Sequence, residues 1–514
     1  MVPDRSSLLR SLDDRFDVLI IGGGATGLGI AVDAVTRGYR TALVEACDFA
    51  QATSSRATKL VHGGVRYLAS GQFHLVYEAL RERATMMRIA PHLIRPLPFV
   101  LPAFRGVDLP FYGAGLLLYN LLSGQASMGP TRVLGASAVT ERVPGIARSH
   151  LAGGVLFHDA QFNDARYALA LARTAIDHGA AVLNYVRCER LLHDSGKIAG
   201  AVLRDGESGA EMTVRANVVI NAAGIFGDEV RILDAPTSKP MLSLSRGSHV
   251  VVRPEVLGGR TALIVPKTSD GRVIFAIPWE GRIVIGTTDV PASVSVNEPG
   301  YTEDEIDYLL QHIAPYLEKP VGREDVLAVF SGLRPLVRGD SVKTSKLSRE
   351  HSIEMSPTGL ITIAGGKWTT YRRMAQDTVN FAIHHSMLKT AECVTSRTPL
   401  HGAGAGSGAG EYGSDATEVE SLITADPALG AALDPALPYI LAQVVYAVRA
   451  EMALTLEDVL ARRTRTVLLD AQAAMRAAPA VAALMARELG RDEAWAANQV
   501  RAFEELAARY YSLR

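Results

Sequence analysis

Three glycines near the start of the chain, Gly22, Gly24 and Gly27, have the spacing G-x-G-x-x-G. Glycines at this spacing allow backbone N–H groups to approach a pyrophosphate at the positive end of a helix. Glu45 follows at the distance where a carboxylate accepts hydrogen bonds from a ribose hydroxyl, and its charge would repel the 2′-phosphate of NADP. The pattern predicts a dinucleotide site that does not take NADP. The alternative is an ordinary tight turn.

The elements around these residues form the βαβ unit that such a site needs. The apolar run Val18–Ile21 predicts a buried strand, the glycines follow it, and a helix pattern covers 26–36 before Gly38. A second apolar strand, Thr41–Val44, leads to Glu45. Because strand, glycines, helix, strand and acid occur in this order, a dinucleotide site is favoured over an isolated turn.

Composition places the chain among globular α/β proteins. Its 514 residues are enough for about two or three domains. Lys and Arg number 53 against 54 Asp and Glu, so a general nucleic-acid binder is disfavoured. The three cysteines Cys47, Cys188 and Cys393 are far apart, which argues against a disulfide framework or a metal site and favours a reducing cytoplasm.

No stretch of the sequence reads as a signal peptide or a membrane span. The most apolar stretch is Leu109–Leu122, which is too short to span and is interrupted by Pro110, Gly113, Gly115 and Asn120. It predicts either an internal helix or a surface that touches a bilayer, and the internal helix is favoured.

A polar loop follows Glu45. It is rich in Ser and Thr and is expected to reach across the cofactor before a turn into a helix, although a long surface connection is the alternative. Its candidate functional residues are Thr53, Ser54, Ser55, Arg56, Lys59, His62 and Arg66.

Three segments carry a resemblance to a known family: TSSRATKLVHGGVRYL at 53–68, SGLRPL at 331–336 and GGKWTTYRRMA at 365–375. With the glycine unit they resemble the flavin-dependent, aerobic-type glycerol-3-phosphate dehydrogenases of the D-amino-acid-oxidase-like flavoproteins. The resemblance implies non-covalent FAD, with its ADP half on the βαβ unit and its isoalloxazine ring along the HGG loop. The cofactor-binding residues it implies are Gly22, Gly24, Gly27, Glu45, Thr53, Ser54, Ser55, Lys59, His62, Gly63, Gly64, Ala223, Gly224, Gly366, Lys367, Thr369 and Thr370.

Two later segments complete the predicted FAD site. The buried run 218–224 predicts a strand ending in small residues, which the resemblance places at the adenosine end; Phe226 stands where the family usually has Trp. A strand at 360–364 then feeds a glycine turn, Lys367, and a helix from Thr369 to about His384. The resemblance places this turn at the N1 and O2 edge of the flavin, where Lys367 would stabilise negative charge.

A second lobe is expected to cover the substrate. The pattern over 72–87 is helical, and repeated prolines after Pro91 indicate an extended connection. The stretch 155–184 predicts a strand, a helix and a strand that return to the nucleotide-binding sheet, and 242–288 predicts short antiparallel strands. Arg334 is expected on a turn before Pro335. The lobe is placed at approximately 85–150 and 240–350, interleaved within a FAD-binding domain at 1–390.

The C-terminal part is predicted to be helical. A Gly-rich linker is expected at 391–414, and a helical domain at 415–514 with helices near 439–452, 456–463, 467–489 and 492–511. The segment 444–465 resembles the C-terminal signature of the same family; without that resemblance it would be a packing or dimerisation module. The expected fold class is α/β: a Rossmann-like FAD-binding domain, a mixed or antiparallel β-sheet substrate lobe and a C-terminal α-helical domain.

The resemblance implies oxidation of sn-glycerol 3-phosphate at C2 to dihydroxyacetone phosphate, with hydride transfer to flavin N5 and electrons passed to a quinone. A phosphate needs guanidinium donors, so Arg334, Arg66 and Arg349 are assigned to it, with Tyr67 adding a hydroxyl.

A proton acceptor for the C2 hydroxyl is also needed, and a histidine is better matched to this role than an arginine. His249 is the first candidate and His62 the second, although each could instead pack as a structural residue. His249 and Lys367 also count among the substrate-binding residues. The predicted catalytic residues are His249, His62, Lys367 and Arg334.

Four alternatives remain open at this point. An oxidase would use O₂ with the same substrate residues, and a relative acting on an amino acid or 2-hydroxy acid would bind a carboxylate instead. A flavin-binding protein without turnover and a nucleic-acid-linked flavoprotein are the others, and balanced charge disfavours the last.

The expected partners are a quinone, a second copy in a homodimer, and the inner face of the cytoplasmic membrane, where the protein would be peripheral.

Overall fold

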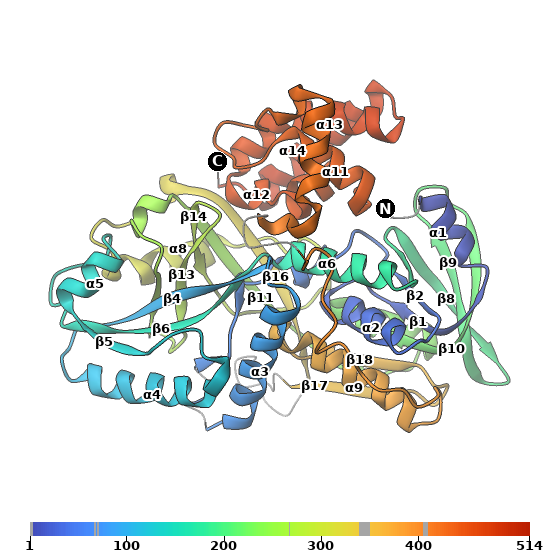
Figure 1. Ribbon diagram of the computed structural model, residues 1–514, viewed down its shortest axis with the longest axis horizontal. Coiled ribbons are helices and arrows are strands. Elements are labelled where there is room, and N and C mark those ends of the chain that lie inside the picture. Colours follow the sequence, from blue (N-terminus) through green and yellow to red (C-terminus); the bar gives the residue numbers. More distant parts are fainter. Residues whose placement is uncertain are drawn as a thin grey trace.

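The computed structural model describes residues 4–65, 68, 71–266, 268–338, 350–404 and 410–513. Two mixed β-sheets lie side by side, and a group of C-terminal helices sits over both (Figure 1). Among the helices of these residues, none combines the length and the apolar character needed to cross a membrane.

The first sheet contains the predicted βαβ unit. Its strand order is β17 (His351–Met355), β18 (Ile361–Gly365), β10 (Glu211–Asn221), β1 (Arg15–Ile21), β2 (Thr41–Val44) and β7 (Ala181–Leu183), with β8 (Val186–Asp194) and β9 (Lys197–Asp205) extending from β10. Strand β1 runs parallel to β2, as the βαβ pattern predicts, and it also runs parallel to β10.

Helices cover one face of this sheet. Helix α2 (Ala25–Thr36) packs between α6 (Asp164–Asp177) and α9 (Tyr371–His384). Alternate residues of β1 enter two cores: Val18 and Ile20 pack with these helices, while Leu19 and Ile21 face β8, β9 and the N-terminal helix α1 (Arg5–Ser11). The period-two burial explains why this short strand is apolar at every position from 18 to 21.

The second sheet is largely antiparallel. Its order is β15 (Val290–Ala292), β11 (Leu242–Val252), β14 (Arg282–Gly286), β13 (Ile274–Trp279), β12 (Ala262–Val265), β4 (Ile94–Ala103), β6 (Gly153–Phe162) and β3 (Leu60–Val61), with β16 (Val326–Val337) beside β11 and β5 (Arg132–Gly135) beside β6. The strands predicted over 242–288 are present and antiparallel.

The strand, helix and strand predicted over 155–184 are present and return the chain to the nucleotide-binding sheet: β6 pairs along its whole length with β4 in the second sheet, and β7, after α6, pairs with β2 in the first. One sequence prediction about the second sheet is wrong. Arg334 lies within strand β16 and not on a turn. Proline is tolerated beside it because β16, in the described part of the sheet, is an edge strand paired with β11, and an edge strand can leave one position without a donor.

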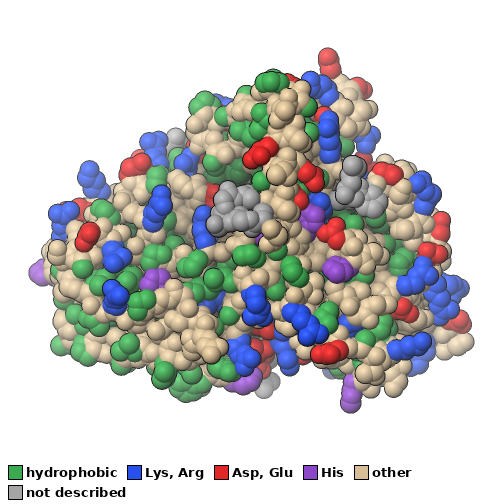
Figure 2. All heavy atoms as spheres, viewed as in Figure 1, with side chains coloured by type: hydrophobic (Ala, Val, Ile, Leu, Met, Phe, Trp, Pro, Cys, Tyr) green, Lys and Arg blue, Asp and Glu red, His purple; other side chains and the backbone are tan. Residues whose placement is uncertain are grey.

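The apolar stretch around 109–122 forms a surface helix, α4 (Asp108–Ser123), so the favoured prediction of an internal helix is also wrong. Leu116, Tyr119 and Ser123 are spaced three and four residues apart and are buried. The opposite face is open to solvent: Phe111 is 75% exposed and Leu121 77%. Hydrophobic side chains accordingly gather along the lower left of the molecule, where α4 lies (Figures 1 and 2).

The C-terminal helices have close to the predicted bounds. They are α10 (Ala416–Ala425), α11 (Leu441–Glu451), a π-helical turn (Asp458–Arg463), α12 (Thr466–Leu469), α13 (Ala471–Leu489) and α14 (Glu493–Tyr510). Their core is shared with the second sheet, because Trp279 of β13 and Phe330 of β16 pack into it. The described part of the predicted linker also packs: Leu400 is buried and its N–H donates to the Ile89 carbonyl at 2.8 Å.

Candidate active site

The parallel strands of the first sheet bring three turns together at one edge. Strands β1, β10 and β18 are neighbours and end near one another, so the segments that follow them, 22–24, 222–224 and 365–367, meet there. The crevice outside the carboxyl ends of parallel strands is where open α/β sheets bind ligands. The predicted residues Ala223, Gly224, Gly366 and Lys367 therefore lie at the same edge as the N-terminal glycines.

The first glycine turn has no room for side chains. Gly22 has φ +116°, and a Cβ there would lie 2.5 Å from the Ala222 carbonyl oxygen. A Cβ on Gly27 would lie 1.9 Å from the Gly22 carbonyl oxygen. Gly24 is the N-cap of α2 and has no side chain of its own to cap the helix. A bare backbone at the positive end of a helix fits the pyrophosphate of FAD.

Glu45, directly after β2, forms a hydrogen bond with this turn. Its Oε2 accepts a hydrogen bond from the Gly23 N–H at 2.6 Å, and its Oε1 accepts one from the Cys47 N–H at 2.9 Å. Burial raises the pKa of the carboxyl, while these two backbone hydrogen bonds oppose the rise. Each carboxylate oxygen has a second lone pair, so the side chain keeps capacity for the predicted ribose contact.

The polar loop after Glu45 joins the two sheets. The Ala25 N–H at the start of α2 donates to Ser54 Oγ at 2.9 Å, and Trp368 Nε1 donates to the Ser54 carbonyl at 2.8 Å. Thr53 Oγ1 donates to the Leu333 carbonyl in β16 at 2.6 Å. Thr53 and Ser54 thus lie between the start of α2 and strand β16, and their contact with the cofactor stays a prediction.

Lys59 was predicted to bind the cofactor, and the structure corrects this. Its ammonium donates to both oxygens of Asp164, at 2.8 and 2.9 Å, and to the Ser55 carbonyl at 2.8 Å. Both side chains of the ion pair are fully buried. Burial and the neighbouring Arg465 lower the pKa of Lys59, and Asp164 opposes them. Lys59 is a structural cation beneath the loop.

The HGG segment reaches the second glycine turn. The His62 N–H donates to Thr369 Oγ1 at 3.3 Å, which brings two predicted cofactor residues together. The Gly63 N–H donates to Tyr119 Oη of α4 at 2.8 Å. Gly366 has φ +77°, a backbone conformation that favours glycine, and a Cβ there would lie 2.3 Å from Sδ of the flexible Met374 side chain. Thr370 is buried directly after Thr369.

His249 is buried on β11 beside the loop. Its ring stacks on Phe330 of β16, with ring centroids 4.5 Å apart and planes within 9°. Its Nε2 lies 3.0 Å from Thr58 Oγ1, a partner that the sequence did not indicate. Burial, and then the charges of Lys59 and Arg334, hold the pKa of His249 well below its usual value. The imidazole is therefore neutral at neutral pH and can accept a proton.

Arg334 is held by the segment that follows β14. Its Nη2 donates to Thr287 Oγ1 at 3.1 Å, and its Nη1 donates to the Thr288 carbonyl at 3.2 Å. Asp289 Oδ1 lies 3.7 Å away. The side chain is 22% exposed, so the guanidinium is fixed in direction while part of it remains accessible.

A buried carboxylate that the sequence analysis missed supports this segment. Glu305 accepts hydrogen bonds from Ser248 Oγ at 2.9 Å and Thr288 Oγ1 at 2.7 Å, and it pairs with Arg246 at 2.7 Å. Glu305 caps α8 (Glu303–Ile313) as the fourth residue of a Thr-x-x-Glu box, a signal readable in the sequence that does not reveal the contact with β11. The predicted substrate residues Arg66, Tyr67 and Arg349 lie outside the described residues.

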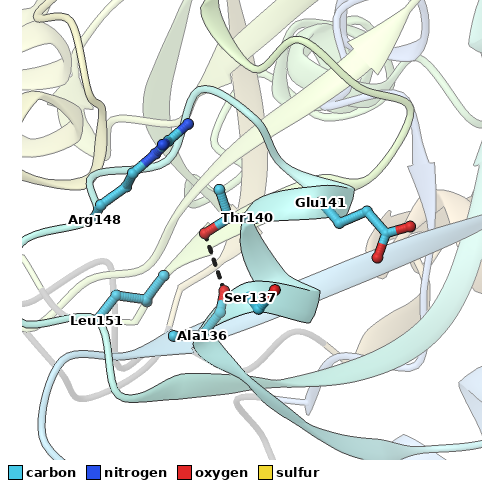
Figure 3. Close-up of a pocket in the computed structure, with 6 residues that line it drawn as sticks. All are labelled: Ala136, Ser137, Thr140, Glu141, Arg148 and Leu151. Atoms are coloured by element: carbon cyan, nitrogen blue, oxygen red, sulfur yellow. Dashed lines mark hydrogen bonds between the residues drawn. The ribbon is translucent and has the colours of Figure 1, made fainter.

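A separate hollow of about 410 Å³ lies beside α5 (Ala136–Arg142), away from these residues. In Figure 3, Thr140 is turned to the Ala136 carbonyl, while Arg148 and Glu141 extend in different directions. Polar groups do not converge in it, and it contains none of the predicted site residues. The described residues of the predicted site gather instead at the edge between the two sheets.

Comparison with known proteins agrees with this geometry. A sequence profile of the FAD dependent oxidoreductases matches residues 17–372, and one for the C-terminal domain of alpha-glycerophosphate oxidase matches residues 356–496. The chain is 42% identical over 551 residues to the probable mitochondrial glycerol-3-phosphate dehydrogenase of Caenorhabditis elegans, covering 100% of this chain and 76% of that protein. The chain belongs to the FAD-dependent glycerol-3-phosphate dehydrogenase family.

Other members of the family are similar over the same extent. The human mitochondrial glycerol-3-phosphate dehydrogenase is 42% identical, over 96% of this chain and 73% of that protein. The crystal structure of the glycerol-3-phosphate dehydrogenase from Bacillus halodurans complexed with FAD superposes with a TM-score of 0.79 at 30% identity, over 98% of this chain and 97% of that chain. The predicted family, α/β fold class and FAD cofactor are confirmed, and the protein is a FAD-dependent oxidoreductase.

Proposed function

We propose that the protein oxidises sn-glycerol 3-phosphate at C2 to dihydroxyacetone phosphate, with hydride transfer to N5 of the bound flavin and onward delivery of the electrons to a quinone. The observation that supports this most is that the cationic side chain of Arg334 and the neutral imidazole of His249 lie on the same face of the second sheet. In the register of β11 and β16, Ser245 lies opposite Arg334 and His249 opposite Phe330. Because side chains two residues apart share a face, Arg334 and His249 project on the same side, separated by Gly247.

Arg334 binds the substrate phosphate in this proposal. Hydrogen bonds that the guanidinium donates to Thr287 Oγ1 and the Thr288 carbonyl orient it, and its accessible part offers further N–H donors. A guanidinium fork matches the geometry of phosphate oxygens and keeps its charge at every physiological pH. Arg66, Tyr67 and Arg349 stay predictions for the same role.

His249 accepts the proton of the C2 hydroxyl. The lowered pKa keeps the ring neutral, although it also makes the ring a weaker base, and Thr58 at 3.0 Å from Nε2 restrains the ring orientation. His62 remains the second candidate, because its backbone is held against Thr369 at the other side of the loop. Lys367 begins the turn Trp368–Thr370, where its charge and the turn amides would stabilise negative charge on the bound ring.

A second function is supported by the C-terminal match. The profile that matches the C-terminal part is named after alpha-glycerophosphate oxidase. The competing proposal is therefore an oxidase that passes the electrons to O₂. Both versions use the same substrate contacts and differ only in the electron acceptor.

A membrane surface is proposed as a partner through α4. Phe111 and Leu121 project from its outer face, and Val107 at its start is also exposed. An apolar helix face of this kind enters the boundary between lipid headgroups and acyl chains. Peripheral association with the inner face of the cytoplasmic membrane would place the enzyme next to a lipid-soluble quinone. The expected homodimer stays a prediction.

The function is tested by anaerobic spectroscopy of the purified holoenzyme. Glycerol 3-phosphate, glycerol and a D-amino acid are added separately while the visible flavin band is recorded. Bleaching by glycerol 3-phosphate alone is expected, and a band that only the amino acid bleaches would exclude the proposed substrate. Reoxidation of the bleached protein by a soluble quinone, compared with oxygenated buffer, then separates dehydrogenase from oxidase.

A further inference from the structure

Three arginines of the C-terminal helices reach the cofactor loop. Arg462 and Arg463 end the π-helical turn and Arg465 follows it, and all three side chains are fully buried. Besides partners within the C-terminal helices, they contact Asp48 and Ser55 of the loop that follows Glu45, about four hundred residues earlier in the chain. Figure 1 shows the C-terminal helices as a group above the region where the two sheets meet.

Two of these arginines hold Asp48. Arg462 Nε donates to Asp48 Oδ2 at 2.5 Å, Arg463 Nη2 donates to Oδ1 at 2.9 Å, and Asn184 Nδ2 donates to the same Oδ1 at 3.1 Å. Burial raises the pKa of Asp48, but Arg463 and Arg462 outweigh it and lower the pKa to about 2. Asp48 is therefore a fully charged anchor at physiological pH.

This anchor is connected to the pyrophosphate turn. Ala50, two residues after Asp48, has φ +59° and donates its N–H to the Gly23 carbonyl at 3.0 Å. A left-handed conformation is uncommon for alanine and persists where its surroundings hold it. Fixing Asp48 thus fixes the backbone that lies against Gly23.

The third arginine holds the other end of the loop. Arg465 Nη2 donates to the Ser55 carbonyl at 2.6 Å and to Asp164 Oδ1 at 3.0 Å. Lys59 donates to the same two groups. Ser55 is next to Ser54, and the Ser54 hydroxyl accepts a hydrogen bond from the first amide of α2. The contact between Arg465 and Ser55 is therefore also connected to the pyrophosphate turn.

We propose that Arg462, Arg463 and Arg465 are positioning residues that make the C-terminal helical unit a clamp on the cofactor loop and so set how tightly FAD is held. The arginines contact the loop at Asp48, before the Thr53–Ser54 segment, and at the Ser55 carbonyl, directly after it. Removing one partner leaves a buried charge without compensation, so the loop cannot keep its position when the contact is lost.

The experiment compares this clamp with a buried ion pair that joins the same units elsewhere. The Glu451 side chain, on α11, accepts from Arg166 of α6 at 2.5 Å and is equally enclosed. The Glu451 backbone carbonyl, which accepts from Arg463 at 2.7 Å, is left in place by a change of the side chain. The test variant is Asp48→Asn and the matched control is Glu451→Gln. The FAD dissociation constant of each stripped and reconstituted protein is measured by flavin fluorescence, alongside the thermal midpoint of each apoprotein.

Asp48→Asn is expected to raise the FAD dissociation constant at least about tenfold, the change that loss of one hydrogen bond to a charged group produces. Glu451→Gln should change it less than about twofold even if both variants lose the same thermal stability. Equal changes in affinity, or an unchanged affinity in Asp48→Asn, would overturn the proposal.

Arg465→Lys provides a second test that keeps the charge beside Asp164 and loses the guanidinium contact with the Ser55 carbonyl. It should also weaken FAD binding relative to Glu451→Gln. If Asp48→Asn and Arg465→Lys both fail to fold while Glu451→Gln folds, the arginines serve stability alone and the proposal falls.

Discussion

The guanidinium of Arg334 lies directly against Gly247, two residues along β11 from His249. A Cβ on Gly247 would stand 2.3 Å from Arg334 Nη2. The contact involves the far end of a flexible side chain, so Gly247→Ala should displace the arginine and leave the strand intact. We expect KM for glycerol 3-phosphate to rise about ten- to a hundredfold. Steady-state kinetics check this, and an unchanged KM would show that the position of the guanidinium is unimportant for binding.

Arg334→Ala removes the proposed phosphate donor. KM should rise by about ten- to a hundredfold or more, as expected for lost hydrogen bonds to a charged group, while FAD stays bound. Exposed Arg253, at the far end of β11, provides the control variant Arg253→Ala, which should leave KM unchanged. Loss of FAD from Arg334→Ala would assign the residue to the cofactor instead of the substrate.

His249→Gln tests the proton acceptor. Glutamine can still contact Thr58 but cannot act as a base, so kcat should fall about 10²- to 10⁴-fold with little change in substrate affinity. Because the pKa of His249 lies well below 6.5, wild-type kcat should show no acid limb near pH 6.5 that belongs to this residue. A variant with normal kcat would transfer the role to His62, and His62→Gln is then the variant to measure.

His401 predicts a pH dependence of stability. Burial lowers its pKa, but hydrogen bonds with Asp177 and Asp415 outweigh burial and raise it to about 9 from 6.5. A raised histidine pKa stabilises the fold fully below pH 6.5, and this contribution is lost as pH rises toward 9. Urea unfolding at pH 6 and pH 9.5 should therefore show a larger loss in the wild type than in His401→Gln. Equal losses in the two proteins would contradict the assigned pKa.

The outer face of α4 predicts lipid binding. The double variant Phe111→Ser/Leu121→Ser should reduce co-sedimentation with anionic lipid vesicles at least about tenfold, since each side chain contributes about 1.5–3 kcal/mol when fully buried. Activity with a soluble acceptor should be unchanged. Val294→Ser changes another exposed hydrophobic residue, 63% exposed and away from α4, and serves as the control. Equal binding by all three proteins would exclude α4 as the docking face.

The sequence predicted the parts of the site that depend on local spacing. Strand, glycines and helix from Val18 to Thr36 follow from burial and backbone geometry within one short stretch, and the C-terminal helices follow from their periodicity. The assignment of Lys59 failed because its partners Asp164 and Arg465 are distant in sequence and brought together only by folding.

Other errors have the same physical origin. The strand β16 was missed at Arg334 because a proline usually ends regular structure, and only its place at a sheet edge makes Pro335 acceptable. Helix α4 was expected inside because its composition is apolar, but no local signal says which faces a neighbouring strand will cover. Thr58 and Glu305 were missed because their roles consist of contacts with β11.

The contact between Asp48 and Arg462 spans 414 positions of the chain. A ribosome makes the polypeptide from its N-terminus, so the glycine turn and the loop emerge long before the arginines that hold them. A nascent chain that stops before residue 461 contains every residue of the predicted FAD site but not this anchor. If this anchor sets the affinity for FAD, firm incorporation of the flavin is expected late in biosynthesis, once residues 462–465 have left the exit tunnel.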